Sequence, residues 1–427
     1  MKILVYGINF APELTGIGKY TGEMARWLAQ AGHEVRVITA PPYYPAWQVG
    51  EGHSARRYRT ESWQGVRVMR TPLWVPRQPG GLKRLLHLGS FAISSLPVLI
   101  AQWRWKPDVV WVVEPPLMCA PAAVAFAALR GARSWLHIQD YEVDAAFDLG
   151  LIQGAMLRRW VERAERWLMR RFDRVSTISG RMVERARGKG VEAQRVVHFP
   201  NWVDIGGIAP LVAPSPYRTE LGLAPDAVVA LYAGNMGNKQ GLEILADVAR
   251  LVQDDPRIQL VIGGNGSGKA DLQARCAGLP NVRFLDLQPL ERLSDWLGLA
   301  DVHLLPQRAD AADLVMPSKL TGMLASGRAV LATARADTEL CRVVEHDAAC
   351  GVVVPPENPI AMAEALRALA ADPARRAALG AQGRRYAEAE LSQDAILHRF
   401  ETQLHALVPG ANVLRDSPAP QQQGVTR

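Results

Sequence analysis

The sequence contains few cysteines, and none of them forms a short paired motif. The four cysteines, Cys119, Cys276, Cys341 and Cys350, are scattered along the chain. No cluster of histidines lies near them in the sequence. Zinc sites and disulfide frameworks need closely or regularly spaced ligands, so this spacing predicts neither. A reducing compartment such as the cytosol is therefore expected, and the segment Met1–Phe10, which lacks a cleavage-site pattern, agrees with it.

A long uninterrupted apolar run is also missing. The best candidate, Leu85–Trp105, is interrupted by Pro97 and by the polar residues His87, Gln102 and Arg104. It falls short of the ~20 clean apolar residues that a membrane span needs. Basic residues and tryptophans at its two ends are typical of a helix lying in the headgroup region, with an apolar face formed by Phe91, Leu96 and Leu99. A helix buried within its own domain is an equally good interpretation.

Charge is moderate in amount but uneven in position. The formal net charge of the chain is +7. The length of 427 residues predicts two or three domains, and the apolar content of 48% is enough for each of them to have a packed core. The segment Arg158–Lys189 holds eleven basic residues against four acidic ones. It is either a solvated helix face or a surface that attracts anionic lipid or a phosphate-bearing acceptor. No nucleic-acid-binding motif accompanies it, so nucleic acid is not expected as a partner.

Strand-like and helix-like segments alternate along the chain in two series, each typical of a parallel, doubly wound sheet. The strands expected in the first series are 2–10, 34–40, 65–71, 108–113, 133–139 and 174–178, and those in the second are 228–232, 259–262, 282–285, 302–305, 329–332 and 352–354. Linker composition at Pro200–Pro216 separates the two series. This predicts an α/β fold of two similar halves, with ligands bound beyond the carboxyl ends of the strands in the cleft between them.

Gly16 and Gly18 lie where the first expected strand turns into a helix. Glycine lets backbone N–H groups approach a phosphate closely, and the start of a helix adds a partial positive charge. The spacing differs from that of the dinucleotide-binding G-x-G-x-x-G motif. We interpret this loop as a contact for phosphate or acceptor, with a plain structural turn as the alternative.

A second glycine-rich loop, Gly263–Ala270, follows an expected strand and nearly matches a Walker A loop. Ala270 stands where that motif needs a Ser or Thr hydroxyl to hold magnesium. An NTPase is therefore disfavoured, and Gly264 is predicted to line a nucleotide pocket.

His137 and Asp140 come at the carboxyl end of an apolar strand, where a side chain can enter the cleft. A single histidine is more often structural than catalytic. Its position and the acidic residues that follow make a functional role an even choice.

Basic residues at two strand-to-helix turns of the second half predict a diphosphate site. The first turn contains Gly234, Asn235, Lys239 and Gln240, and the second contains Pro317, Ser318 and Lys319. Lysine acts on a diphosphate as a point charge, and proline before free N–H groups suits a helix start that binds an anion. Two such cations could replace a metal in neutralising a diphosphate leaving group. Consistent with this, the chain has no D-x-D triplet, and neither a metal nor a cofactor is expected.

These residues resemble those of the retaining GT-B glycosyltransferase family 4. The segments Met1–Gly50, His137–Asp144 and Phe199–Trp202 are especially similar to the fucosyltransferases of colanic acid biosynthesis within it. The resemblance covers nearly the whole chain. It implies two Rossmann-like doubly wound domains that face a central cleft, with transfer that retains the anomeric configuration.

The resemblance also implies a division of the chain and a substrate class. Residues 1–205 would form an acceptor-side domain, 206–390 a nucleotide-sugar-binding domain, 391–408 a helix that returns to the first domain, and 409–427 a disordered tail. The first donor to expect is GDP-fucose, with UDP-sugars next. The acceptor would be a polyprenyl-diphosphate-linked oligosaccharide of exopolysaccharide biosynthesis, at the inner face of the plasma membrane, to which a cytoplasmic enzyme attaches peripherally.

Residue roles follow by analogy with the family. The glycine loop at Gly16 and Gly18 would contact donor phosphate, and His137 the transferred sugar. Lys239 and Lys319 would stabilise the departing diphosphate, while a leaving-group oxygen helps to deprotonate the acceptor hydroxyl. No pair of catalytic carboxylates is then required.

The sequence departs from the family pattern at two places. Asn235 and Gln240 stand where the family usually has Arg and Lys, with Lys239 one position early. The paired glutamates of the family fall at Leu314 and Gly322, which leaves the ribose-binding carboxylate to be replaced by Glu339, Asp310 or Asp313. Two other functions stay open: a nucleotide-sugar 2-epimerase of the same fold, and a non-catalytic assembly factor that binds nucleotide sugar.

Overall fold

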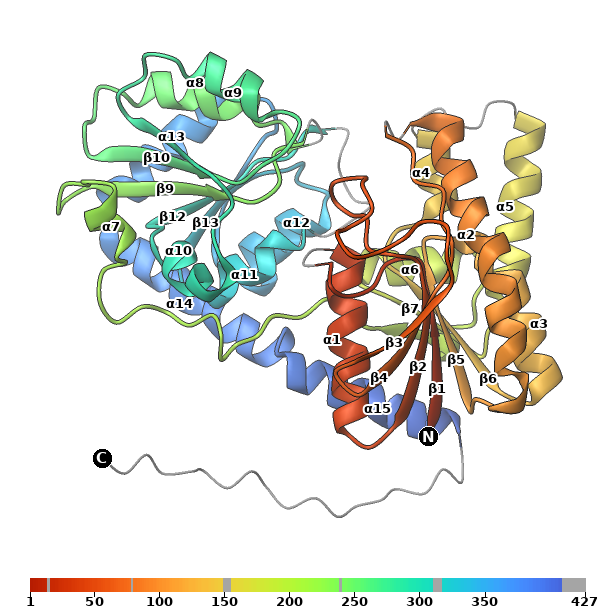
Figure 1. The fold of residues 1–427 in the computed structure, drawn as a ribbon. Coiled ribbons are helices and arrows are strands. Elements are labelled where there is room, and N and C mark those ends of the chain that lie inside the picture. The colour runs from red at the N-terminus through yellow and green to blue at the C-terminus, as the bar shows by residue number, and fades with distance from the viewer. Residues whose placement is uncertain (14–15, 78–79, 149–154, 238–239, 310–316, 409–427) are drawn as a thin grey trace, which may run out of the picture. The chain divides into compact units, whose positions relative to one another are not determined.

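The computed structural model describes residues 1–13, 16–77, 80–148, 155–237, 240–309 and 317–408 (Figure 1). The chain divides into two compact units. Unit 1 comprises Met1–His137, Trp167–Arg174 and the chain from Phe400 onward, and unit 2 comprises Ile138–Arg166 and Val175–Arg399. The expected tail, 409–427, lies outside the described residues. The predicted site residues Lys239, Asp310 and Asp313 also lie outside them.

The first sheet has eight strands in the order β3-β4-β2-β1-β5-β6-β7-β8. Their bounds are β1 Lys2–Tyr6, β2 Glu34–Thr39, β3 Arg59–Trp63, β4 Val66–Arg70, β5 Val109–Glu114, β6 Arg133–Ile138, β7 Arg174–Thr177 and β8 Val196–His198. The central strand β1 pairs in parallel with β2 and with β5, and the edge strand β3 pairs with β4 in the antiparallel direction. Such central strands are covered on both faces, which is why β1 and β5 read as nearly continuous apolar runs.

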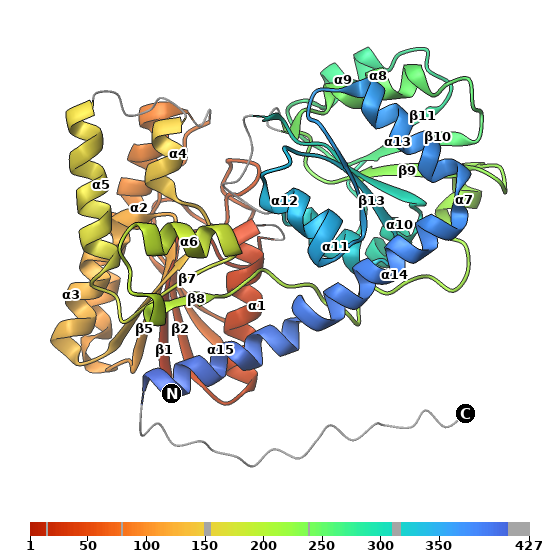
Figure 2. The same ribbon diagram turned by 180° about the vertical axis from the view of Figure 1, so that it is seen from behind.

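Helices cover both faces of this sheet. Helix α1 (Gly16–Gln30) lies on one side of it, and α2 (Gly81–Ala101) and α3 (Ala120–Arg130) lie on the other (Figures 1 and 2). Tyr20, Met24, Trp27, Leu28 and Ala31 recur at helical spacing. Tyr20, Met24 and Leu28 are buried on α1, whereas Trp27 is half-buried and Ala31 is exposed just beyond the helix. Gly32 follows with a φ of 88°.

The second sheet has six strands in the order β11-β10-β9-β12-β13-β14. Their bounds are β9 Val228–Ala233, β10 Ile258–Gly263, β11 Val282–Leu285, β12 Val302–Leu305, β13 Ala329–Thr333 and β14 Gly351–Val354. Each pairing is parallel, from β10 with β9 to β13 with β14. The strand order reverses direction between β9 and β12, so the loops after these two strands diverge to opposite faces and leave room for a ligand at their carboxyl ends.

Two layers of helices enclose the second sheet (Figure 1). One layer contains α8 (Glu243–Leu251), α9 (Lys269–Arg275) and α13 (Pro359–Ala371), and the other contains α10 (Leu293–Gly298), α11 (Lys319–Ala325) and α14 (Pro373–Glu390). The short helices α7 (Tyr217–Glu220) and α12 (Glu339–Arg342) complete this part. Two apolar clusters fill the space between the sheet and its two layers.

The remaining helices are α4 (Glu142–Asp148), α5 (Ala155–Met169), α6 (Gly180–Gly188) and α15 (Gln393–Leu407). Phe400 of helix α15 packs against Trp111 and Trp135 of the first sheet, with ring centroids 6.2 and 5.1 Å away. The basic segment is not uniformly solvated: Lys189 is buried and pairs with Asp144 and Glu165.

Of the three residues expected on the exposed apolar face of α2, only Leu96 is exposed. Phe91 and Leu99 are buried in the core, at 0% and 2% exposure, so the prediction is wrong for these two. The exposed apolar side chains of α2 are Leu82, Leu86, Ile93, Leu96 and Ile100. By length and composition alone, Gly81–Arg104 is the one helix among the described residues that could cross a membrane, and a third of its most apolar window is buried. Pro97 stands within it.

Candidate active site

The glycine loop of unit 1 is built around a buried carboxylate. Glu13 accepts hydrogen bonds from the backbone N–H groups of Tyr43 and Tyr44, at 3.0 and 3.1 Å, and from the side-chain amide of Asn9 at 2.9 Å. A Cβ on Gly18 would lie 2.5 Å from a Glu13 carboxylate oxygen and 2.7 Å from its Cβ. Gly18 is therefore required for packing against Glu13, while Gly16, at a φ of 61°, starts the helix.

Burial raises the pKa of Glu13, and the three hydrogen bonds and Arg70 oppose that rise. Arg70 is itself buried and donates to the carbonyl oxygens of Ala11 and Ala40, at 2.7 and 2.9 Å. Glu13 and Arg70 thus fix the loop from both sides. Neither residue was predicted from the sequence, although Glu13 stands only a few positions before Gly16 and Gly18.

His137 is the next-to-last residue of strand β6, and its ring is enclosed. It is 2% exposed and stacks on the indole of Trp111 from β5, with centroids 5.0 Å apart and planes 18° from parallel. Burial lowers the pKa of His137 to about 3, so the imidazole is neutral at physiological pH. A neutral imidazole can donate and accept one hydrogen bond each but carries no charge for a diphosphate. Asp140, half-buried, follows in the turn before α4.

Lys319 lies at the first position of α11, close to the end of strand β9. Its ammonium group donates to the Tyr232 hydroxyl and, at 3.2 Å, to the carbonyl oxygen of Asn235, and it lies 4.3 Å from the Tyr232 ring centroid. Burial lowers its pKa to about 8. The structure thus brings three of the predicted residues, Gly234, Asn235 and Lys319, into one cluster.

Glycines allow the loops after β9 and β10 to touch. A Cβ on Gly264 would lie 1.9 Å from the Gly234 carbonyl oxygen, and a Cβ on Gly234 would lie 2.6 Å from Lys319 Cε. Both glycines have positive φ, 138° and 133°. The Walker-like loop therefore supports the Lys319 cluster by backbone packing, and its Lys269 pairs with Asp286 and Asn265.

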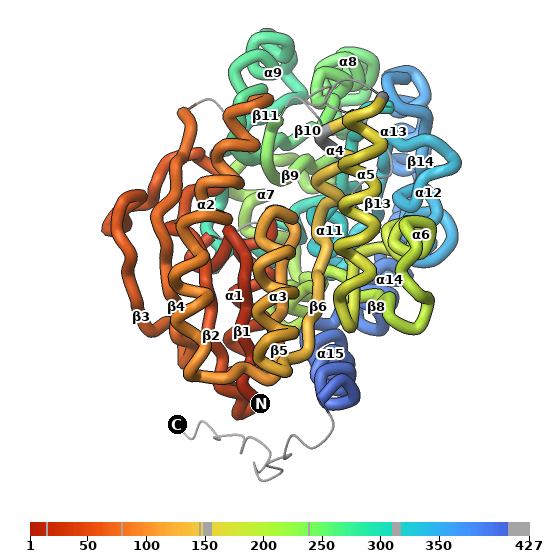
Figure 3. The backbone as a smooth tube through the Cα atoms, turned by 90° about the vertical axis from the view of Figure 1, so that its right-hand side faces the viewer, coloured from red at the N-terminus to blue at the C-terminus, as the bar shows by residue number. Residues whose placement is uncertain are grey.

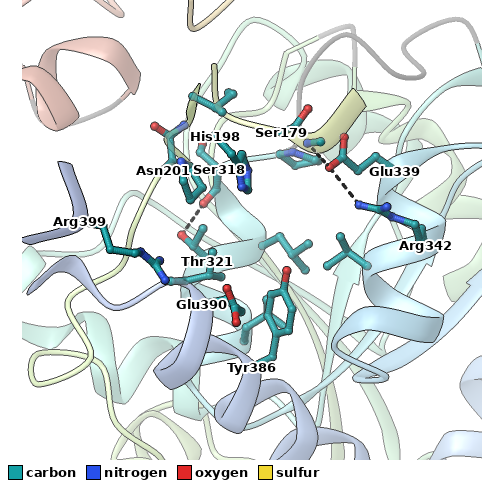
Figure 4. Close-up of a pocket in the computed structure, with 18 residues that line it drawn as sticks. Ser179, His198, Asn201, Ser318, Thr321, Glu339, Arg342, Tyr386, Glu390 and Arg399 are labelled. Carbon is teal, nitrogen blue, oxygen red and sulfur yellow. Dashed lines mark hydrogen bonds and ion pairs between the residues drawn. The ribbon is translucent and has the colours of Figure 1, made fainter. Parts of the chain in front are cut away.

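The other residues predicted in this unit lie nearby in the chain. Gln240 is half-buried and its backbone N–H donates to the Gly237 carbonyl oxygen at 3.2 Å. Pro317 and Ser318 immediately precede Lys319 and line a pocket of about 350 Å³ (Figure 4). This pocket lies within unit 2. Its labelled polar lining comprises Ser179, His198, Asn201, Ser318, Thr321, Glu339, Arg342, Tyr386, Glu390 and Arg399.

Glu339 lines the pocket but is already engaged. Its two carboxylate oxygens accept hydrogen bonds from the backbone N–H groups of Gly180 and Arg181, at 2.8 and 3.0 Å, at the start of α6. Arg342 lies 3.6 Å away (Figure 4). A carboxylate oxygen has two lone pairs, so Glu339 keeps acceptor capacity for a hydroxyl group. Sequence reasoning did not select Arg342 or Arg399, and Asn201 was marked only by the resemblance at Phe199–Trp202.

Comparison with known proteins identifies the class. Residues 15–202 match the family model of a glycosyl transferase 4-like domain, and residues 227–372 match that of glycosyl transferases group 1. The chain therefore belongs to glycosyltransferase family 4 and is a glycosyltransferase.

Two individual relatives show which glycosyltransferases this chain is similar to. The chain is 47% identical over 406 residues to WcaI of Escherichia coli (strain K12), assigned as a colanic acid biosynthesis glycosyl transferase, with 94% of this chain and 98% of that protein covered. It is 31% identical to the D-inositol 3-phosphate glycosyltransferase of Kineococcus radiotolerans, with 87% and 86% covered.

Solved structures confirm the expected fold. Sucrose-phosphate synthase from Thermosynechococcus elongatus superposes with a TM-score of 0.72 at 17% identity, covering 95% of this chain and 99% of that one. WaaG, a glycosyltransferase of lipopolysaccharide biosynthesis, superposes with a TM-score of 0.65 at 15% identity, covering 95% and 100%. The two parallel-rich sheets are those of a GT-B protein with two Rossmann-like domains, as the sequence predicts.

Proposed function

We propose that this glycosyltransferase moves a sugar, with GDP-fucose as the first donor to test, onto a polyprenyl-diphosphate-linked oligosaccharide with retention at the anomeric carbon. The product would belong to an exopolysaccharide of the colanic acid type. The assignment of WcaI to colanic acid biosynthesis supports the pathway, because the likeness covers nearly all of both chains. HepE of Anabaena, a structural neighbour at 15% identity, was solved in complex with UDP, which supports a nucleotide-sugar donor.

The observation that carries the proposal is the position of Lys319. A cation at the start of α11, beside the end of β9, lies where ligands of open α/β sheets bind. A diphosphate placed there would gain a charge-assisted hydrogen bond from the ammonium group as the sugar–phosphate bond loosens. Lys239 is proposed as a second cation for the same group. Pro317 and Ser318 connect this position to the pocket, which we propose receives the donor.

The sugar–phosphate bond breaks towards the diphosphate, and the electron pair that leaves with its oxygen is stabilised by the lysine charge. The acceptor hydroxyl attacks the same face of the anomeric carbon and passes its proton to that leaving-group oxygen. His137, neutral and fixed by its stack on Trp111, is proposed to orient the transferred sugar by hydrogen bonding.

The test is a mass-spectrometric transfer assay. Purified protein is offered GDP-fucose and a panel of UDP-sugars, together with polyprenyl-diphosphate oligosaccharides extracted from an exopolysaccharide producer. A mass gain of one sugar on the lipid, dependent on one donor, is expected. Sugar-nucleotide turnover without any acceptor would instead indicate an epimerase, and nucleotide-sugar binding without turnover in all mixtures would indicate a non-catalytic binding protein.

A further inference from the structure

Two histidines and a glutamate from opposite ends of the chain meet in unit 1. His33 follows the carboxyl end of α1, and Glu401 and His405 lie one turn apart on α15. His33 Nε2 is 2.9 Å from a Glu401 carboxylate oxygen, and His405 Nε2 is 3.9 Å from the same oxygen. One ligand atom from each of the three residues lies within 4.8 Å of the other two. A single ion could therefore reach all three.

The positions of the three side chains are well fixed. Helix α15 passes the amino-terminal ends of β1 and β2 (Figures 1 and 2), and its Phe400 is anchored against Trp111 and Trp135. Glu401 and His405, at i and i+4, face the same way on that helix. The His33 side chain is 5% exposed and follows Gly32 in the tight turn before β2.

We propose that His33, Glu401 and His405 form a binding site for a divalent transition-metal ion, with zinc as the natural candidate. Two imidazole nitrogens and one carboxylate oxygen are a donor set that zinc prefers and that magnesium and calcium do not. A water molecule would fill the fourth tetrahedral position. The ion would fasten α15 to the turn after α1.

The second ring nitrogen of His33 has a neighbour outside the proposed ligand set. His33 Nδ1 lies 3.2 Å from the amino group of Met1. A ligating histidine commonly has such an outer neighbour at the nitrogen that does not bind the metal, and this contact helps to fix the orientation of the ring.

This site is separate from the proposed chemistry. Gly16 starts α1 and His33 follows its other end, and a 15-residue helix is roughly 22 Å long. The inference concerns how α15 is held and does not depend on the proposed donor or acceptor. Its failure would leave the glycosyltransferase proposal untouched.

The experiment is a titration of the chelator-treated full chain with Co²⁺, a spectroscopic probe for zinc sites, followed by Zn²⁺. We expect visible absorption typical of a four-coordinate ion, saturation at one equivalent, and its loss when Zn²⁺ displaces the probe. At a hundredfold excess over Kd, Zn²⁺ should raise the midpoint of thermal unfolding by roughly 5 °C or more.

Variants of residues on α15 test whether Co²⁺ binds at the proposed site. His405→Gln and Glu401→Gln should each weaken Co²⁺ binding by about tenfold or more, whereas His398→Gln, an exposed histidine on the same helix, should not change it. His405 is the more exposed ligand, so its variant remains informative if the Glu401 variant is unstable. No saturable binding to the unaltered chain, or equal binding to His405→Gln, would overturn the proposal.

Discussion

At the scale of single residues, the charge of Lys319 is the feature on which the proposed leaving-group stabilisation depends. Lys319→Ala removes the cation, and we expect kcat/KM to fall by about 10²-fold, as when a preorganised donor to a developing charge is lost. Transfer kinetics and donor affinity measure this. Arg367→Ala is the control, because it removes a cation of the same unit that is engaged with Asp254 at the surface. Equal losses in both variants would contradict the assignment.

The same residue predicts a pH dependence of donor binding. With a pKa of about 8 in the free protein, Lys319 is charged below this pH and neutral above it. A bound diphosphate favours the charged form, so binding above pH 8 requires proton uptake. Donor affinity should therefore fall by up to about tenfold per pH unit above pH 8. Calorimetric titration across this range measures it, and the decline should be absent in Lys319→Ala.

His137 offers a way to separate packing from chemistry. His137→Phe keeps a ring for the stack on Trp111 but removes both nitrogens. We expect this variant to remain folded and to lose most of its transfer activity. His137→Ala leaves a cavity and should cost about 3 kcal/mol of stability as well. Full activity of the Phe variant would show that His137 has only a structural role.

At the scale of elements, the turn into α1 should be intolerant of even one methyl group. Gly18→Ala would push the Glu13 carboxylate from its three donors, and a buried unsatisfied group costs about 1–3 kcal/mol. Thermal unfolding and transfer should both be impaired. Gly188→Ala, where a Cβ meets nothing within 4 Å, is the matched control and should be close to neutral. A fully active Gly18→Ala protein would contradict the packing argument.

Most strands were predictable from sequence because apolar residues dominate them, and this holds even for β11 and β14 at the two edges of the second sheet. All the strands of the second sheet fall at the expected positions, within a residue at their ends. The missed strands are β3, a polar hairpin strand at the edge, and β8, which has three residues. The first strand was expected to reach Phe10 but ends at Tyr6, because Ile8 and Phe10 are buried without continuing the sheet.

The orientation of α2 could not be predicted, for a related reason. Its apolar residues are spread around most of the helix, so spacing alone does not select the face that meets the sheet. Phe91 and Leu99 were assigned to the wrong side. In the structure, the contacts of α2 with the sheet and with α3 determine which face of the helix is buried (Figure 3).

At the scale of the whole molecule, the contacts that sequence could not predict are those between distant segments. Glu13 is buried because backbone donors some thirty residues later meet it, and Glu339 is held by donors at Gly180 and Arg181. His33 and Glu401 are 368 positions apart. Motif spacing could select Lys319 because Pro317 and Ser318 before it mark a helix start, but it did not show that Tyr232 would contact its ammonium group. A residue that is recognisable only by its distant partner carries no local signal. The fold itself was predictable because its strands and helices are locally encoded.

We expect the exposed apolar stripe of α2 to determine how the whole chain distributes between solution and membrane. Leu82, Leu86, Ile93, Leu96 and Ile100 form the stripe, and exposed basic residues flank it at Lys83 and Arg104. Such an arrangement binds anionic lipid surfaces through combined apolar burial and charge. We expect the protein to sediment with vesicles containing phosphatidylserine or phosphatidylglycerol and to be partly released by salt.

Replacing Ile93 and Ile100 together by glutamine keeps good helix formers but removes two apolar side chains, each worth about 1.5–3 kcal/mol when fully buried. Even if these two side chains insert only partly into the membrane, we expect their replacement to lower the affinity for vesicles by about tenfold or more. Leu251→Gln with Ile360→Gln, a pair of exposed apolar residues of unit 2, is the matched control and should bind as the unaltered chain does. If the two double variants bind vesicles equally well, the α2 stripe is not the membrane-binding surface. The basic face of α5, with its exposed Trp160 and Trp167, is then the next candidate.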